Sequence, residues 1–171
     1  MGLDMYLRKE KYLSAYRFQR EQVEKDPERF EELAKEIAMF DKMVEMIGMK
    51  PSEDSPSFLV QATVCYWRKA NAIHAYFVRE HANGVDQCQP IEVGAEDLRV
   101  LLEKAKLAKA SAEKSKTIPT DNLPPQSGFF FGPTDEVEGY VSDMYDTIRQ
   151  LEPLVSVPDA DDYTYVYQAS W

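Results

Sequence analysis

The chain has 171 residues, of which 44% are hydrophobic and 12% aromatic, and it carries a formal net charge of −10. The high apolar content excludes an intrinsically disordered protein, and the length predicts a single domain over residues 1–171. The negative charge argues against general nucleic-acid binding, which needs a basic surface to neutralise phosphates.

Localisation is predicted from the absence of a recognisable signal peptide, membrane span or disulfide framework. The N-terminal residues turn polar at Asp4 and lack the apolar core of a signal peptide. No apolar run approaches the length of a membrane span. Cys65 and Cys88 are too few for a disulfide scaffold and are expected to be reduced thiols. We therefore expect a cytoplasmic protein without a membrane partner.

The first third of the chain predicts one strand and one long helix. Alternating apolar and polar side chains over residues 3–8 indicate a short strand. Over residues 27–48, apolar side chains recur every three or four positions between Pro27 and Gly48, which is typical of an amphipathic helix. Residues 50–57 are rich in proline, serine and acids and predict a loop.

The rest of the chain alternates strands and helices. Residues 58–64 have strand composition, and residues 66–82 predict a helix that Asn83 and Gly84 close. Residues 113–127 lack periodicity and predict a surface connection. Further signals indicate a strand at 91–93, helices at 96–112 and from the N-cap Thr134 onward, and a terminal strand at 163–168. These elements predict an α+β fold, one compact domain with about four helices and a small, largely antiparallel sheet that pairs the two terminal strands.

Polar and aromatic side chains cluster at the start of the second predicted helix. On a helix, Arg68, Asn71 and His74 recur every three residues and form one stripe. Together with Trp67 and Lys69, this stripe combines cations, an amide, an imidazole and an indole. Such a set suits an anionic, planar or sugar-bearing ligand. The alternative is that the indole belongs to the core, His74 is buried with satisfied hydrogen bonds, and the cations are solvated.

A second cluster is the aromatic segment of residues 128–132, Gly-Phe-Phe-Phe-Gly. Its glycines permit a positive φ or a close approach of the backbone, and extended residues point to alternate faces. One interpretation places Phe130 in a pocket beside Gly132, and the alternative is an ordinary buried strand. The predicted ligand-binding residues are therefore Trp67, Arg68, Lys69, Asn71, His74, Phe130 and Gly132.

Signals for metal binding and catalysis are weak. His74, His81 and Cys88 lie seven residues apart, which is not a zinc spacing, so we expect neither a metal site nor a cofactor. An enzyme that uses His74 as a general base, supported by Cys88 or Asp143, remains an alternative. Because no nucleophile motif or phosphate-binding loop accompanies these residues, the sequence favours binding over catalysis.

Acidic residues are concentrated near the C-terminus. Between Asp135 and Asp162, nine acids are accompanied by Arg149 alone, which gives this segment a charge of −8. A run of this kind is usually a solvated face. The alternative is that the helix over residues 135–152 forms a docking surface for a basic protein.

Several blocks of the sequence resemble a family of small proteins of bacteriophages, prophages and their bacterial hosts. The matching blocks are MGLDMYL at residues 1–7, YWRKANAIH at 66–74, Gly84-Val85-Asp86 with Cys88, Leu123-Pro124 through GFFFG at 128–132, and Ser170-Trp171. The resemblance spans nearly the whole chain, with residues 27–48 as a family-variable insertion. It implies the cytoplasm of a bacterial host and an accessory role, such as antagonism of a host defence system.

These observations predict a small cytoplasmic protein that sequesters or senses an anionic small molecule, for example a nucleotide-like one. One alternative is an acidic inhibitor that docks on a basic host protein, and another is an enzyme with a site centred on His74.

Overall fold

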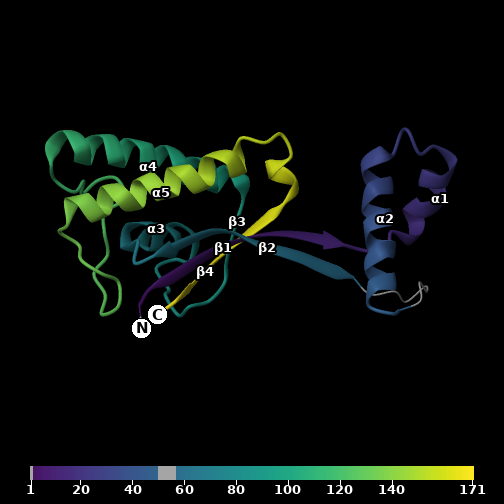
Figure 1. Ribbon diagram of the computed structural model, residues 1–171, viewed down its shortest axis with the longest axis horizontal. Coiled ribbons are helices and arrows are strands. Elements are labelled where there is room, and N and C mark those ends of the chain that lie inside the picture. The colour runs from purple at the N-terminus through teal and green to yellow at the C-terminus, as the bar shows by residue number, and fades with distance from the viewer. Residues whose placement is uncertain (1, 50–56) are drawn as a thin grey trace. The chain divides into compact units, whose positions relative to one another are not determined.

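The computed structural model describes residues 2–49 and 57–171 (Figure 1). Contacts divide the chain into two compact units, residues 1–10 with 62–171 and residues 11–61, which are described separately. The predicted α+β class is confirmed, because the described residues form five α-helices and a four-stranded antiparallel sheet. The elements are β1 (Asp4–Leu13), α1 (Arg17–Lys25), α2 (Glu31–Met46), β2 (Phe58–Arg68), α3 (Asn71–His81), β3 (Ile91–Val93), α4 (Ala95–Ser115), α5 (Val137–Val155), the 3-10 helix η1 (Ala160–Asp162) and β4 (Thr164–Ser170).

The sheet has the strand order β2-β1-β4-β3, so its first and last strands are neighbours at the centre. β1 and β4 pair antiparallel, with Met5 opposite Ala169 and Leu7 opposite Tyr167, which confirms the predicted pairing of the terminal strands. All four side chains are buried, because alternate positions along a strand point to the same face. This face forms one side of the main core.

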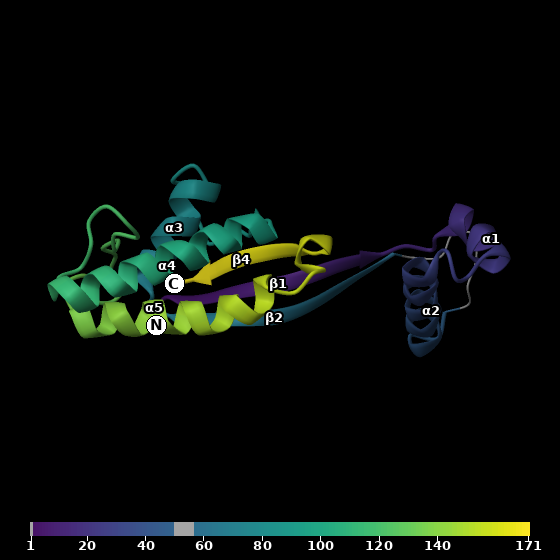
Figure 2. The same cartoon turned by 90° about the horizontal axis from the view of Figure 1, so that it is seen from above.

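Helices supply the rest of the main core. α4 and α5 lie side by side in both views (Figures 1 and 2). α4 buries Leu98, Leu101 and Ala105, and α5 buries Met144 and Leu151, at the spacing of amphipathic helices. These side chains form one cluster with the inward side chains of the sheet. Among the described residues, no helix combines the length and the apolar character needed to span a bilayer.

The predicted helix over residues 66–82 is wrong in its first part. β2 continues to Arg68 because it lies beside β1 in the sheet, and α3 begins only at Asn71. Trp67 is therefore a strand residue, and the predicted stripe does not exist as one helix face. The end of the helix is as predicted, with Gly84 in the left-handed region at a φ of 76°.

Two helix boundaries also differ from the prediction. α4 continues to Ser115, which lies inside the predicted connection over residues 113–127, because Ala112 still buries its face against the core. α5 begins at Val137 rather than directly after Thr134, because the intervening N-cap residue has an extended backbone, with a φ of −87° and a ψ of 104°. The connection beyond α4 contains no helix or strand.

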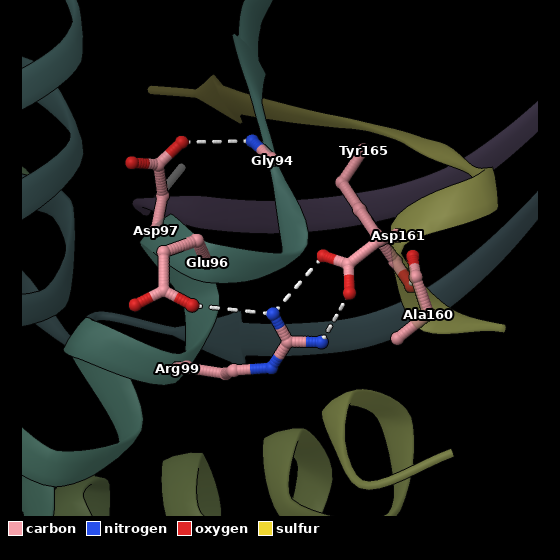
Figure 3. Close-up of polar contacts among 7 residues, drawn as sticks. All are labelled: Gly94, Glu96, Asp97, Arg99, Ala160, Asp161 and Tyr165. Atoms are coloured by element: carbon pink, nitrogen blue, oxygen red, sulfur yellow. Dashed lines mark hydrogen bonds and ion pairs between the residues drawn. The ribbon is translucent and has the colours of Figure 1, made fainter. Parts of the chain in front are cut away.

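Arg99 joins the start of α4 to the segment that precedes β4 (Figure 3). Its guanidinium donates to both carboxylate oxygens of Asp161, at 3.0 and 2.8 Å, and to Glu96 at 3.2 Å. Nearby, the Gly94 N–H donates to Asp97 Oδ2 at 2.8 Å and so satisfies a backbone group at the helix start. The ion pair also neutralises one carboxylate of the acidic C-terminal segment.

The unit of residues 11–61 contains α1, α2 and the adjoining ends of β1 and β2. Its small core consists of Leu13, Phe40 and Val44. α2 lies within the predicted helix of residues 27–48. The sequence did not predict α1, because none of its residues is buried and no apolar stripe marks it. The predicted loop of residues 50–57 lies outside the described residues, apart from Ser57.

Candidate functional site

A tight turn between β2 and α3 positions the predicted site residues. Lys69 has a φ of 60°, in the left-handed region. Its N–H donates to the Leu3 carbonyl at 2.8 Å, and its own carbonyl accepts from the Asn71 N–H at 2.8 Å. Ala70, between them, has a φ of −75° and a ψ of 71°, which is an inverse γ-turn. The end of the strand and the start of the helix consequently border the same space.

Trp67 and His74 lie in the core. Trp67 is 3% exposed, and its Nε1–H donates to Thr147 Oγ1 at 3.0 Å. His74 is 1% exposed, with Nδ1 2.7 Å from the Tyr167 hydroxyl and Nε2 2.9 Å from Asp86 Oδ2. We assign the ring proton to Nε2, since a neutral imidazole then donates to the carboxylate and accepts from the hydroxyl. This is the arrangement of the alternative interpretation, in which the indole is core and the histidine is buried and satisfied.

The order carboxylate, imidazole, hydroxyl in Asp86, His74 and Tyr167 is that of a catalytic triad. Its hydroxyl, however, is enclosed: Tyr167 is 0% exposed, and burial raises the pKa of this phenol well above its usual value. Trp171 Nε1–H donates to the second oxygen of Asp86 at 3.2 Å. These hydrogen bonds therefore join α3, the loop after it and the C-terminal strand, and the geometry supports a structural role.

A pocket of about 160 Å³ opens beside the turn. It brings together three of the predicted residues, Arg68, Lys69 and Asn71, with one face of α5. Trp67, His74, Phe130 and Gly132 do not line this pocket. The lining residues are Arg68, Lys69, Asn71, Ile118, Pro125, Pro133, Glu136, Gly139, Tyr140 and Asp143.

The aromatic segment of residues 128–132 packs against the turn between β2 and α3. It forms a turn rather than a strand, and the Phe130 carbonyl accepts from the Leu3 N–H at 3.2 Å. Gly132 has a φ of 87°, and a Cβ added there would lie 3.3 Å from the Lys69 Cβ. Glycine thus serves both the positive φ and the close approach to Lys69.

Asn71 fixes the wall of the pocket. Its Nδ2 donates to the carbonyls of Phe131, at 3.2 Å, and Pro133, at 2.9 Å. Both amide hydrogens are thereby used, and only the side-chain carbonyl oxygen remains for a ligand. The role of Asn71 is mainly to hold the loop between the aromatic segment and α5.

The cations of the pocket are unpaired. Within residues 2–49 and 57–171, the side chains of Arg68 and Lys69 make no ion pair and no hydrogen bond. Two other arginines are neutralised by carboxylates, Arg20 by Asp41 at 2.7 Å and Arg99 by Asp161 at 2.8 Å. In an acidic chain, two adjacent cations without a carboxylate partner leave positive charge available at the pocket.

Asp143 is the most perturbed carboxyl group of the pocket. Burial, and then the neighbouring Asp146, raise the pKa of Asp143 to about 7. Its carboxyl group makes no hydrogen bond with a side chain or backbone group of the described residues. An acid of this kind exchanges its proton near neutral pH, as groups in binding and catalytic sites often do.

Two residues at the pocket occupy backbone conformations that are unfavourable for their residue type. A left-handed residue other than glycine, such as Lys69, is strained by roughly 1–2 kcal/mol. Gly139 lies inside α5, where glycine is less stable than alanine by about 0.5–1 kcal/mol. Conflicts between local preference and structure are expected at functional sites, and here both border one pocket.

Replacement of Gly139 by alanine is expected to stabilise the protein by about 0.5–1 kcal/mol, because a Cβ there meets only Glu136 atoms, at 3.7 and 3.8 Å. Urea unfolding measures the change. Gly128→Ala is the opposite control, because its Cβ would lie 2.5 Å from the Phe131 ring and should destabilise the fold. If Gly139→Ala lowers stability, the helix at this position is strained in a way that the structure does not show.

No three His, Cys, Asp or Glu side chains in the described part of the chain are grouped to hold a metal ion. No family model matches the chain, and no curated protein or solved structure shows significant similarity to it.

Proposed function

We propose that the protein binds a small anionic molecule in the pocket between the β2–α3 turn and α5. The observation that carries this proposal is the unpaired state of Arg68 and Lys69 at the pocket. A guanidinium offers a two-pronged set of donors for a carboxylate or phosphate, and an ammonium adds a second positive charge.

The volume limits what the pocket encloses. Pockets for drug-sized ligands measure about 300–1,000 Å³, and this one measures about 160 Å³. A nucleotide-like ligand would place its phosphate between Arg68 and Lys69 and leave its base outside. The resemblance to phage proteins leads us to propose sequestration or sensing in a bacterial cell, with counter-defence as one role.

Removal of either cation is expected to weaken binding strongly without loss of the fold. Thermal shift and native mass spectrometry of the purified protein, with phosphate, sulfate, small carboxylic acids and mononucleotides as probes, should reveal a binding anion. Arg68→Ala and Lys69→Gly are each expected to weaken it at least tenfold, because each removes a positive charge from the pocket.

Lys116→Gly is the matched control for Lys69→Gly. Lys116 also has a positive φ, of 58°, but it caps α4 and does not line the pocket. Both changes relieve a left-handed lysine, so both should keep or raise stability by up to about 1 kcal/mol. Affinities that are equal in the two glycine variants and in the unchanged protein would overturn the proposal.

The alternative function, docking of the acidic segment on a basic protein, has less support. Three of the nine acids between residues 135 and 162 are ion-paired within the chain, namely Asp146 with Arg149, Glu152 with Lys106 and Asp161 with Arg99. These pairs reduce the negative charge that is free to attract a partner.

A further inference from the structure

The pocket holds opposite charges that do not neutralise one another. Arg68, at the end of β2, and Lys69, in the turn after it, line one side of the pocket. Glu136, the N-cap residue of α5, and Asp143, within α5, line the other. Among the described residues, none of these four side chains takes part in an ion pair. Arg68, Lys69 and Glu136 are exposed and Asp143 is half-buried, so charges of both signs are available to a ligand at the pocket.

Charges that face one another across a cavity without contact are complementary to a molecule that carries both signs. An anion without a positive group would satisfy the cations but would also lie beside two acidic side chains. A ligand with an ammonium group would match both walls. We propose, on the basis of the anion-binding function above, that the ligand is a small zwitterion whose carboxylate or phosphate faces Arg68 and Lys69 and whose ammonium faces Glu136 and Asp143.

The neutral polar groups of the pocket add one hydrogen-bond acceptor. Both amide hydrogens of Asn71 are used by backbone carbonyls, so its remaining polar atom is an acceptor. The Tyr140 hydroxyl donates to the Leu123 carbonyl at 2.9 Å, which leaves its ring as the pocket surface. The Asn71 oxygen is thus available to accept one hydrogen bond from a donor group of the ligand, such as its ammonium.

The volume also supports a small zwitterion. The pocket measures about 160 Å³, which is below the roughly 300–1,000 Å³ of pockets for drug-sized ligands. A molecule of the size of one amino acid or phosphoethanolamine suits this space, whereas a nucleotide would keep its base outside.

Paired probes test the role of the ammonium group. Titration calorimetry at pH 8 would compare the twenty standard amino acids, β-alanine and phosphoethanolamine with the corresponding molecules that lack the ammonium group. We expect at least one zwitterion to bind at least tenfold more tightly than its counterpart. Asp143→Asn and Arg68→Ala should each weaken that binding at least tenfold. Glu138→Gln, which removes an exposed carboxylate of the same helix outside the pocket lining, should leave it unchanged.

The outcomes separate this inference from the proposed function. One outcome is that counterparts without an ammonium group bind as tightly as the zwitterions, with an affinity that Asp143→Asn leaves equal or raises. In that case the proposal of a zwitterionic ligand is wrong, and the proposal of an anion-binding site stands. If inorganic and organic anions and all zwitterions fail to bind, or bind equally after Arg68→Ala, both proposals are overturned.

Discussion

Asp143→Asn is expected to stabilise the protein at pH 8 by on the order of 2–4 kcal/mol and to leave its stability almost unchanged at pH 4. Burial raises the pKa of this carboxyl group from 3.8 to about 7, so the folded state favours the protonated form. Below about pH 4 both the folded and the unfolded chain hold the proton, and the group contributes no difference.

As the pH rises from about 4 to about 7, the unfolded chain loses this proton while the folded chain keeps it, so stability falls. Above about pH 7 the folded chain carries a partly buried carboxylate, and the full penalty is present. The nearby carboxylate of Asp146, also on α5, further disfavours the ionisation of Asp143. The other charged residues of the pocket lining are Glu136, Arg68 and Lys69.

Urea unfolding at the two pH values measures the change in stability. Glu138→Gln is the control, because this substitution removes the same charge from an exposed position of the same helix. A stabilisation of equal size at pH 4 and pH 8 would show that the gain comes from a source other than the proton. Bound zwitterion should reverse the preference, because an ammonium group favours the ionised form of Asp143.

His74→Ala is expected to destabilise the fold by about 3–5 kcal/mol, because it leaves a cavity and removes the partners of two buried polar groups. Those groups are the Tyr167 hydroxyl and the carboxylate of Asp86. Chemical denaturation measures the loss. Tyr167→Phe, which removes only the hydroxyl, should destabilise by about 1–2 kcal/mol and remain folded.

His81→Ala is the matched histidine control on α3, since its buried Nε2 makes no hydrogen bond within the described residues. It should destabilise less than His74→Ala, because it breaks no such network. A loss below 1 kcal/mol for His74→Ala would contradict a structural role, and it would return His74 to consideration as a general base.

The prediction from sequence included three residues of the pocket but assigned them to the wrong secondary structure. The prediction grouped Arg68, Lys69 and Asn71 because they are close in the chain, and the structure brings all three to one pocket. It placed them on one helix, because the composition of residues 66–70 does not reveal that pairing with β1 extends the strand. Strand pairing is a long-range interaction, and periodicity within the segment does not report it.

The other wall of the pocket carried a local signal that could have been recognised. Glu136, Gly139, Tyr140 and Asp143 follow one face of α5 at helical spacing, and a glycine interrupts an otherwise helical pattern there. The sequence alone does not indicate that this face meets the turn after β2. Similarly, the partners of His74 come from 12 and 93 residues away.

All residues that line the pocket belong to the unit of residues 1–10 and 62–171. The described residues of the segment 11–61 contribute no side chain to the pocket, and they have their own small core around Phe40. Substitutions in these residues therefore leave the lining of the pocket unchanged. One chain thus carries two parts whose sequences can vary independently, and only one of them forms the pocket.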